Sequence, residues 1–277
     1  MSKRQLDEND SMGESSEDEQ DNLTLGANGD ANEIVEVDFV FTDPCEANFH
    51  SVKQHLVQFL PASKLDTSNL ANLIVGQVAV GSMVCAEGET DVFGLITALN
   101  LKRYGAEPSI QQIVSLVSSK CPDASRQRFE QILANHNVGL VVSRRLINLP
   151  YQLVPHLHSA LQQDIDWAIE NEQNPGIKES YKFEYFLFLA GVQVEKQTKK
   201  APAGKKAKAS AYTDPAIKTY DNFEDEFLEQ EADIAFTFPT KNELKEGAGI
   251  NTEISAFLIK RQKHNASLAS IAQMLNI

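Results

Sequence analysis

The feature that most limits the fold of this chain is the way its apolar residues change their spacing along residues 34–238. Every second residue from Val35 to Phe41 is apolar, which is typical of a strand with one buried face. Residues 49–60 instead place apolar side chains three to four positions apart, which indicates an amphipathic helix. The chain therefore has to combine a sheet with helices that cover it.

The same patterns predict the remaining elements of the domain. Residues 78–85 and 92–101 are expected to form a hairpin whose turn is at residues 87–90. Ser109 is the expected N-cap of the helix that follows. The element order predicts a mixed α+β domain with a largely antiparallel sheet and flanking helices. Further strands are expected at residues 139–143, 182–195 and 234–238, and helices at residues 70–75 (or a turn), 109–120, 126–135 and 154–170.

The two ends of the chain are expected to lie outside this domain, which is assigned to residues 33–240. Residues 1–38 carry twelve acidic and two basic residues. Such a segment buries too little apolar surface to offset the entropy of ordering it, so residues 1–32 are expected to be a disordered acidic tail. Residues 241–277 are expected to form an appendage of two short amphipathic helices, at residues 252–263 and 267–275.

The charge of the chain narrows the classes of partner. Its 277 residues have a formal net charge of -14. Such a surface repels polyphosphate, so direct nucleic-acid binding is disfavoured and a basic protein partner is favoured. The first residues lack the apolar core of a signal peptide, and no apolar stretch is long enough to span a bilayer. We therefore expect neither secretion nor membrane insertion.

A lysine cluster interrupts the domain. Residues 196–210 hold six lysines and no acidic residue. A nuclear-import signal, bound extended by an import receptor, and a solvated surface loop both fit this segment; a nucleic-acid patch fits less well, because no aromatic residues are interspersed. The candidate import residues are Lys199, Lys200, Lys205, Lys206 and Lys208.

An acidic cluster follows. Residues 221–233 hold seven acidic residues and no basic one, and aromatic side chains interrupt the charge. Aromatic residues among carboxylates suit the anchoring of a basic client. An exposed loop with its aromatics tucked onto the domain fits equally well. The candidate partner-binding residues are Phe223, Glu224, Asp225, Glu226, Phe227 and Glu229.

No catalytic, cofactor or metal site is predicted. Residues 76–82 approach a phosphate-binding loop but lack its lysine, so Gly76 and Gly81 are expected to serve a bulge or a close backbone approach. His156 and His158 are two positions apart, and on a helix they face different directions. The cysteines lack paired spacing, so they are expected to be reduced, buried thiols. They are Cys45, Cys85 and Cys121.

Four blocks, at residues 37–56, 77–101, 138–155 and 223–238, share their order and spacing with a known family. The most specific reads Gly139-Leu-Val-Val-Ser-Arg-Arg-Leu-Ile-Asn-Leu-Pro. Over about residues 34–240 the chain resembles the BCCIP family, whose fungal members are called BCP proteins. Arg144 departs from the family pattern, which often has an acidic residue there, and residues 241–277 do not resemble the family core.

The resemblance implies a non-enzymatic nuclear protein that shuttles to the cytoplasm. It implies a chaperone of a large-subunit ribosomal protein, with roles in ribosome biogenesis and nuclear export; an adaptor for cell-cycle or DNA-repair proteins is the alternative. It also implies a fold similar to GCN-five-related acetyltransferases. Residues 77–81 miss the spacing of the acyl-CoA turn in that fold, so an acetyltransferase is disfavoured. We expect a monomer whose acidic segments mask a basic client.

Overall fold

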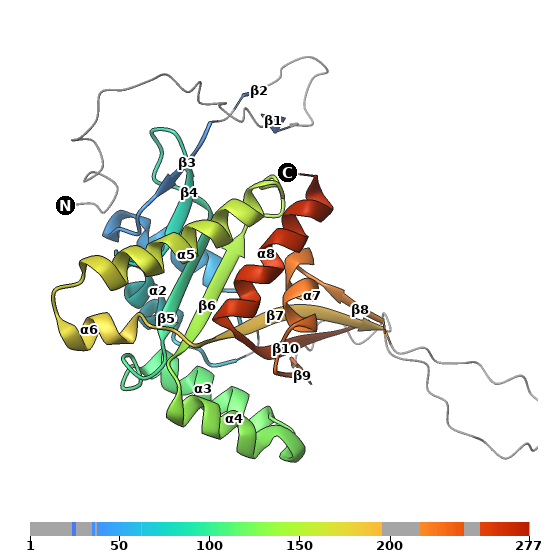
Figure 1. The fold of residues 1–277 in the computed structure, drawn as a ribbon. Helices are drawn as coiled ribbons and strands as arrows, with labels where there is room; N and C mark the ends of the chain where they lie inside the picture. Colours follow the sequence, from blue (N-terminus) through green and yellow to red (C-terminus); the bar gives the residue numbers. More distant parts are fainter. Residues whose placement is uncertain are drawn as a thin grey trace, which may run out of the picture.

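The computed structural model describes residues 24–25, 35–36, 38–61, 63–195, 217–240 and 250–276. An eight-stranded sheet runs through the molecule, with helices on both faces (Figure 1). Its order is β3-β4-β5-β6-β7-β10-β9, and β8 also pairs with β7. All pairings are antiparallel except that of β6 with β7. The predicted mixed α+β class is confirmed.

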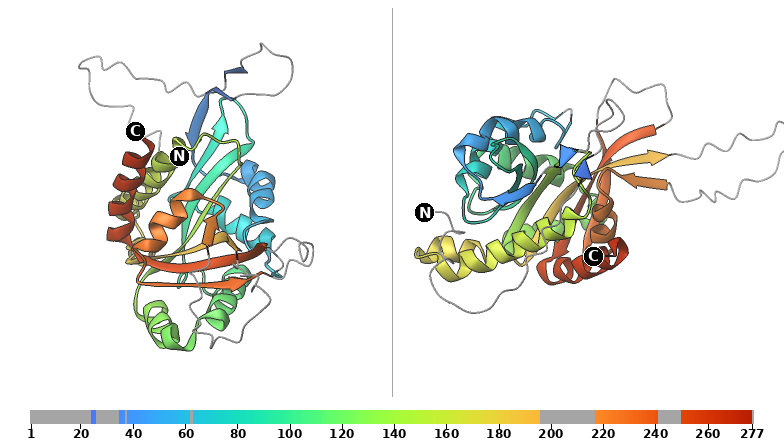
Figure 2. Two further views of the ribbon diagram at one scale, coloured as in Figure 1. Left: turned by 90° about the vertical axis from the view of Figure 1, so that its right-hand side faces the viewer. Right: turned by 90° about the horizontal axis from the view of Figure 1, so that it is seen from above.

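The strands of the sheet lie close to the expected positions, except that β8 was not predicted and that the C-terminal end differs. Figure 2 shows the strong twist of the sheet, in which β9 and β10 cross the direction of β4 and β5. The strands are β3 (Phe39–Thr42), β4 (Ser82–Ala86), β5 (Val92–Asn100), β6 (Val138–Arg145), β7 (Tyr185–Glu195), β8 (Ile217–Tyr220), β9 (Ile234–Pro239) and β10 (Ile250–Lys260).

The helices divide between the two faces of the sheet, and a hydrophobic core lies under each set. The first core packs α1 to α4 against the sheet, and the second packs α5, α7 and α8 against the other face (Figure 1). The helices are η1 (Glu46–Asn48), α1 (Phe49–Leu56), α2 (Thr67–Gly76), α3 (Pro108–Lys120), α4 (Asp123–Asn135), α5 (Leu153–Asn171), α6 (Pro175–Ser180), α7 (Phe223–Gln230) and α8 (Arg261–Leu275).

The expected helical appendage is wrong, because residues 250–260 form strand β10 between β7 and β9. Ile254 and Leu258 join the first core, while Phe257 and Ile259 join the second. A strand buried on both faces has no polar side to alternate with, so its apolar run resembles that of a helix. The strand at residues 234–238 is therefore not the last one, and residues 250–275 belong to the domain.

Three local expectations also need correction. Helix α3 begins after Glu107, and Ser109 lies inside it with its hydroxyl 2.6 Å from Asn69 Oδ1. Strand β4 begins at Ser82 rather than at residue 78. The preceding turn contains Gly81 at φ +148°, where a Cβ would lie 3.1 Å from both Pro44 and Thr97, so the expected close approach holds there. At Gly76, by contrast, no atom outside its own helix and its chain neighbours lies within 4 Å of a Cβ, so the expected close approach is wrong there.

The N-terminal region is described only in part. Strand β1 (Thr24–Leu25) pairs antiparallel with β2 (Val35–Glu36) in a separate two-stranded sheet. Thr24 and Leu25 thus form a short strand within the segment that was expected to be a disordered tail. The other residues of the acidic tail lie outside the described part of the chain.

Candidate functional site

The acidic cluster at residues 221–233 forms helix α7, and its first carboxylates point inward. Glu224 is 1% exposed, and its carboxylate accepts hydrogen bonds from both terminal nitrogens of the Arg145 guanidinium, one of them 3.0 Å long. The same guanidinium lies 5.8 Å from the ring centre of Phe223. Asp225 is 5% exposed. Glu224 and Asp225 are thus internal. The expectation that they contact a partner is wrong, because their side chains are buried inside the domain.

Glu229, another candidate partner-binding residue, connects three elements. Its carboxylate accepts hydrogen bonds from Lys218 Nζ at 2.8 Å, from Tyr220 at 2.7 Å and from Ser255. Burial alone would raise the pKa of Glu229, but these hydrogen bonds outweigh it and lower that pKa. Glu229 therefore stays ionised while it joins β8, α7 and β10, so it too serves the fold rather than a partner.

The three remaining candidate partner-binding residues are divided between the core and the surface. Phe223 and Phe227 pack against the second core, which matches the alternative reading of aromatics tucked onto the domain. Glu226 is exposed. Of the six candidate partner-binding residues, Glu226 alone has an exposed side chain. The sequence carries no signal for this division, because the partners of these carboxylates lie on β6, β8 and β10.

The start of α7 closes a gap in the sheet. Strands β6 and β7 pair only over Val138–Leu140 with Tyr185–Leu187, and they separate beyond that point. The backbone N–H of Asp221 donates to the carbonyl of Gly191 on β7 at 2.9 Å, while Glu224 binds Arg145 on β6. Residues 221–225 thus bridge the two diverging strands.

Two further titratable groups, Arg144 and Asp225, lie in this gap. Burial lowers the pKa of Arg144, and the charges of Asp221 and Asp225 oppose that shift. Burial, followed by the charge of Glu224, raises the pKa of Asp225 to about 8. Arg144 and Arg145 were expected to follow the strand, but both belong to β6. Their inward position makes them structural ions of the gap.

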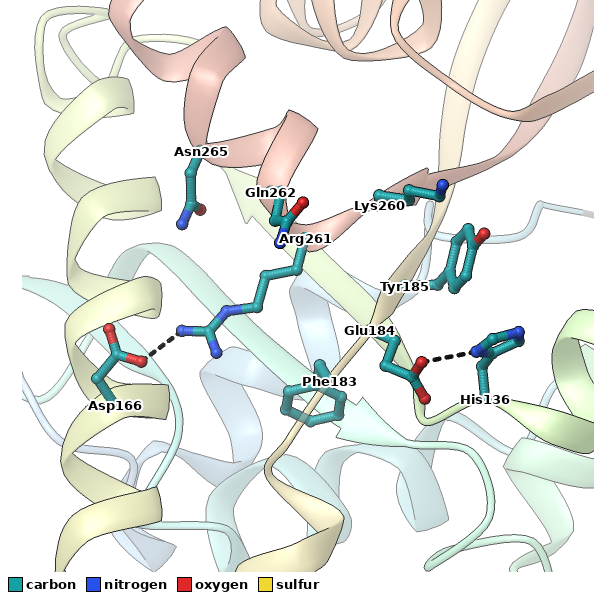
Figure 3. Close-up of a pocket in the computed structure, with 9 residues that line it drawn as sticks. All are labelled: His136, Asp166, Phe183, Glu184, Tyr185, Lys260, Arg261, Gln262 and Asn265. Atoms are coloured by element: carbon teal, nitrogen blue, oxygen red, sulfur yellow. Dashed lines mark hydrogen bonds and ion pairs between the residues drawn. The ribbon is translucent and has the colours of Figure 1, made fainter.

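A cavity of about 630 Å³ opens at the other end of β7, where β10 meets α8 (Figure 3). A hydrogen bond and an ion pair line it: His136 Nδ1 lies 2.7 Å from Glu184, and Arg261 Nη2 lies 2.6 Å from Asp166. The hydrogen bond from His136 lowers the pKa of Glu184. Lys260 faces Asp233 at 3.8 Å. The charged side chains among the described lining residues therefore already have partners, and none of them is left unpaired for a charged ligand.

A polar network runs from this cavity into the second core. The Arg261 Nε–H donates to Gln162 Oε1 at 2.9 Å, and Gln162 Nε2 lies 3.1 Å from His264 Nδ1. His264 Nε2 lies 3.0 Å from His158 Nδ1. Burial lowers the pKa of both histidines to about 3, so both are neutral near pH 7. His158 Nε2 is buried and has no partner within the described residues.

The histidine pair was not predicted, since its members lie 106 positions apart in sequence. The expectation that His156 and His158 face different directions is confirmed, because only His158 is buried. Cys85 and Cys121 are buried as expected, but Cys45 is exposed. In the described part of the chain, no three His, Cys, Asp or Glu side chains are grouped so that they could hold a metal ion.

An exposed apolar turn follows β6. The Leu146 N–H donates to the Phe93 carbonyl at 2.8 Å, and the Leu149 N–H donates to the Leu146 carbonyl at 3.1 Å. Leu149 is buried, whereas Ile147 is exposed over its whole side chain (105%). Leu146 (42%) and Tyr151 (54%) are also exposed. The sequence signal for this feature was an apolar pair next to turn-forming Asn and Pro, within the family block.

A smaller cavity of about 310 Å³ adjoins this turn. It lies between the end of α1, the start of β5 and Leu146. Its lining residues are Ser51, Gln54, His55, Asp91, Val92, Phe93 and Leu146.

The lysine cluster and the expected lack of a membrane span concern other parts of the chain. The candidate import residues Lys199, Lys200, Lys205, Lys206 and Lys208 all lie outside the described residues. Among the helices that the structure describes, none combines the length and apolar character that crossing a bilayer demands.

Comparison with known proteins gives one consistent result. The BCCIP family model matches residues 34–228. The chain is 30% identical over 223 residues to "Protein BCCIP homolog" of Arabidopsis thaliana, covering 78% of this chain and 66% of that protein. It is 34% identical over 212 residues to "Protein bcp1" of Aspergillus oryzae, covering 72% and 69%.

A solved structure has the same fold. The crystal structure of BCP1 from Saccharomyces cerevisiae superimposes with a TM-score of 0.61 at 20% sequence identity, covering 86% of this chain and 89% of that chain. At this identity the likeness concerns the fold alone, and it extends beyond the residues that the family model matches. The matched residues include the diverging strands, the apolar turn and the start of α7. The chain belongs to the BCCIP family.

Proposed function

We propose that this chain is a non-enzymatic chaperone or adaptor that binds a basic protein client, such as a ribosomal protein of the large subunit. The observation that carries the proposal is the net charge of -14, combined with the way acidic residues are used. Glu224 and Glu229 have bases of their own inside the fold. The acidic residues of the β4–β5 turn, Glu87, Glu89 and Asp91, are exposed. The surplus of negative charge is therefore available to a partner.

The proposed mechanism is electrostatic masking. A ribosomal protein has basic surfaces that evolved for RNA, and free in the nucleus they bind RNA indiscriminately. An acidic chaperone competes for those surfaces and speeds the encounter by attraction at a distance. Release follows when the assembling ribosome supplies the correct RNA site. This mechanism supports roles in ribosome biogenesis and in nuclear export of protein cargo.

The direct test is competition against RNA. A purified basic large-subunit ribosomal protein is mixed with this chain and with unrelated RNA, and the complexes are separated by sedimentation. We expect a soluble protein–protein complex and less RNA bound. Polyglutamate of the same charge serves as the control, and a chain that protects no better than polyglutamate contradicts the proposal. Affinity purification from nuclear extract then separates ribosomal clients from cell-cycle and repair proteins, the alternative partners.

The nuclear location is part of the same proposal. The lysine cluster suits an import receptor, because regularly spaced lysines complement an acidic groove. Replacing Lys205, Lys206 and Lys208 by alanine should leave the protein in the cytoplasm when a fluorescent fusion is imaged. Persistent nuclear accumulation of this variant contradicts direct import through the cluster and favours import together with a client.

We also propose that the fold is related to that of GCN-five-related acetyltransferases without keeping an acyl-CoA site. The separation of β6 and β7 after three paired residues supports the likeness. Residues 77–81 lack the spacing of the acyl-CoA turn, whose backbone amides bind the pyrophosphate. The Arg145–Glu224 pair and residues 221–225 occupy the gap between β6 and β7. Calorimetry with acetyl-CoA should therefore show no binding, and micromolar affinity contradicts this proposal.

A further inference from the structure

We infer that the turn at residues 146–149 and the cavity beside it form the docking point for the client. The occupant that fits is a basic segment that presents one large apolar side chain. This inference rests on the proposed function and adds the surface, the anchoring residue and the chemistry of the bound segment.

The exposure of Ile147 is the first argument. An isoleucine whose side chain is 105% exposed at a turn contributes nothing to the folded core. Turns of this kind favour Asn, Asp, Gly or Pro at their central positions, so local conformation does not explain an isoleucine there. An apolar side chain in this place gains free energy only when a partner covers it.

The turn is also held rigidly. Its first residue donates to the Phe93 carbonyl of β5, and its fourth residue, Leu149, is buried. Leu149 packs so closely on the sheet that a Cβ on Gly94 would lie 2.8 Å from its Cδ2. Ile147 is therefore presented in one place before any partner arrives, which lowers the entropy lost on binding.

The adjoining cavity supplies a receptor for an apolar side chain. Its volume of about 310 Å³ lies at the lower end of ligand pockets, and its apolar walls come from Val92, Phe93 and Leu146. Val57, three positions after the lining residue Gln54, is a further apolar residue that is 60% exposed. Ile147 and the cavity thus offer a projection and a hollow side by side.

The charges around the cavity select a basic partner. Asp91 lines it, and Glu87 and Glu89 are exposed on the same hairpin turn. Among the described residues that line the cavity, His55 is the one titratable base, and its Nε2 lies 2.7 Å from the Val92 carbonyl. Burial lowers the pKa of His55, so it is neutral near pH 7 and does not repel a cation. The positive charge of Arg144 also lowers the pKa of His55, but Arg144 is itself desolvated by burial and balanced by the charges of Asp221 and Asp225.

This arrangement of charge also argues against other occupants. A second copy of the chain would bring its own acidic turn to the same place, and an acidic peptide or an anionic membrane would be repelled. A segment rich in lysine and arginine that includes a leucine or phenylalanine can contact both the apolar cavity and the acidic turn beside it. The apolar side chain fills the cavity while the cations face Asp91, Glu87 and Glu89.

The substitution Ile147→Asp separates apolar docking from general attraction. If charge alone held the client, an added carboxylate would leave binding unchanged or strengthen it. If Ile147 is an anchor, its loss weakens binding about 10- to 100-fold, the range expected for one buried isoleucine. Val78→Asp, at another exposed apolar residue (42%) that does not line this cavity, is the matched control and should bind as the wild type does.

A second measurement maps the contact directly. A short peptide of lysine and arginine with one central leucine is titrated into the methyl-labelled protein, and the Ile147 methyl resonance should shift. The same peptide with serine in place of leucine should bind much more weakly. Glu87→Lys with Glu89→Lys should weaken the leucine peptide several-fold. Unfolding temperatures equal to that of the wild type show that these variants are folded.

The outcomes are distinct. A wild-type chain that binds no basic client overturns the proposed function itself. A chain that binds the client equally well with and without Ile147 leaves that function standing and overturns this docking surface. Concentration-dependent dimers that Ile147→Asp abolishes would assign the surface to a second copy instead, which also overturns the inference.

Discussion

At the scale of single residues, neighbouring carboxylates of α7 have opposite roles. Glu224 lies inside the gap between β6 and β7 and binds Arg145, whereas Glu226, two positions on, is exposed. A buried ion pair adds little net stability compared with apolar residues, but removing one partner leaves an uncompensated charge. The two glutamates therefore offer a direct contrast between a structural and a surface charge.

The change Glu224→Gln should lower the free energy of unfolding by about 3–5 kcal/mol, because it leaves the Arg145 guanidinium buried without its counter-ion. Glu226→Gln should change that free energy by less than about 0.5 kcal/mol. Urea titration followed by circular dichroism measures both. Equal effects for the two variants would contradict the inward position of Glu224.

The buried histidine pair predicts how stability depends on pH. The pKa of His158 and that of His264 are lowered by burial to about 3, whereas an unfolded chain binds these protons below about pH 6.5. The unfolded state therefore gains protons first, and stability falls as pH decreases from about 6.5 toward 3.

The variant His158→Gln tests this link. Gln can still accept the hydrogen bond of His264 but does not titrate, so the slope of unfolding free energy against pH between 6 and 4 should decrease by up to about 1.4 kcal/mol per pH unit. Denaturant titrations at several pH values give the slope. His156→Gln, at the exposed neighbour, is the control and should leave the slope close to that of the wild type.

At the scale of secondary-structure elements, β10 decides whether the sheet is complete. It pairs with β7 along Ile250–Lys260 and with β9 along Glu253–Leu258, and it contributes to both cores. Its hydrogen bonds cannot be replaced by solvent in the middle of a sheet. The residues that appeared to be an appendage are thus central to the domain.

A chain that ends after Thr240 should therefore fail to unfold cooperatively, because β7 and β9 lose the strand between them and both cores lose apolar side chains. Thermal circular dichroism of the purified fragment is the measurement. A chain that lacks residues 1–32 keeps the whole eight-stranded sheet and should retain a sharp transition. A cooperative transition in the fragment that ends at Thr240 would contradict the central role of β10.

At the scale of the whole molecule, long-range charge and local apolar contact should contribute separately to client binding. Salt screens the attraction of the net charge of -14, since the Debye length is about 10 Å at 0.1 M salt. The contact of Ile147 is apolar and depends little on salt.

Client affinity should therefore fall several-fold between about 0.1 and 0.5 M salt and then level off for the wild type. For Ile147→Asp it should continue to fall, because charge would be the main attraction left. Fluorescence anisotropy with a labelled ribosomal protein gives both curves. Parallel curves at every salt concentration would contradict a separate apolar anchor.

Most elements of the fold could be predicted from the sequence, because apolar spacing is a local property that reports which side of a strand or helix is buried. The strands near residues 39 and 92 and the helix at residues 154–170 followed from it. The excess of acidic charge followed from the composition. Strand β10 could not be recognised, because burial on both faces removes the alternation that identifies a strand.

The candidate site depended far more on the tertiary structure. Sequence showed that residues 221–229 combine acidic and aromatic side chains, but not that Glu224 faces Arg145, 79 positions away. It showed an apolar pair after β6, but not that Leu149 is buried while Ile147 is exposed. A residue type is local, whereas its burial and its charge partner depend on which strands the sheet brings together. The sequence alone therefore determined the elements and the total charge, and the packing of β6, β7 and α7 decided which charges are free to bind.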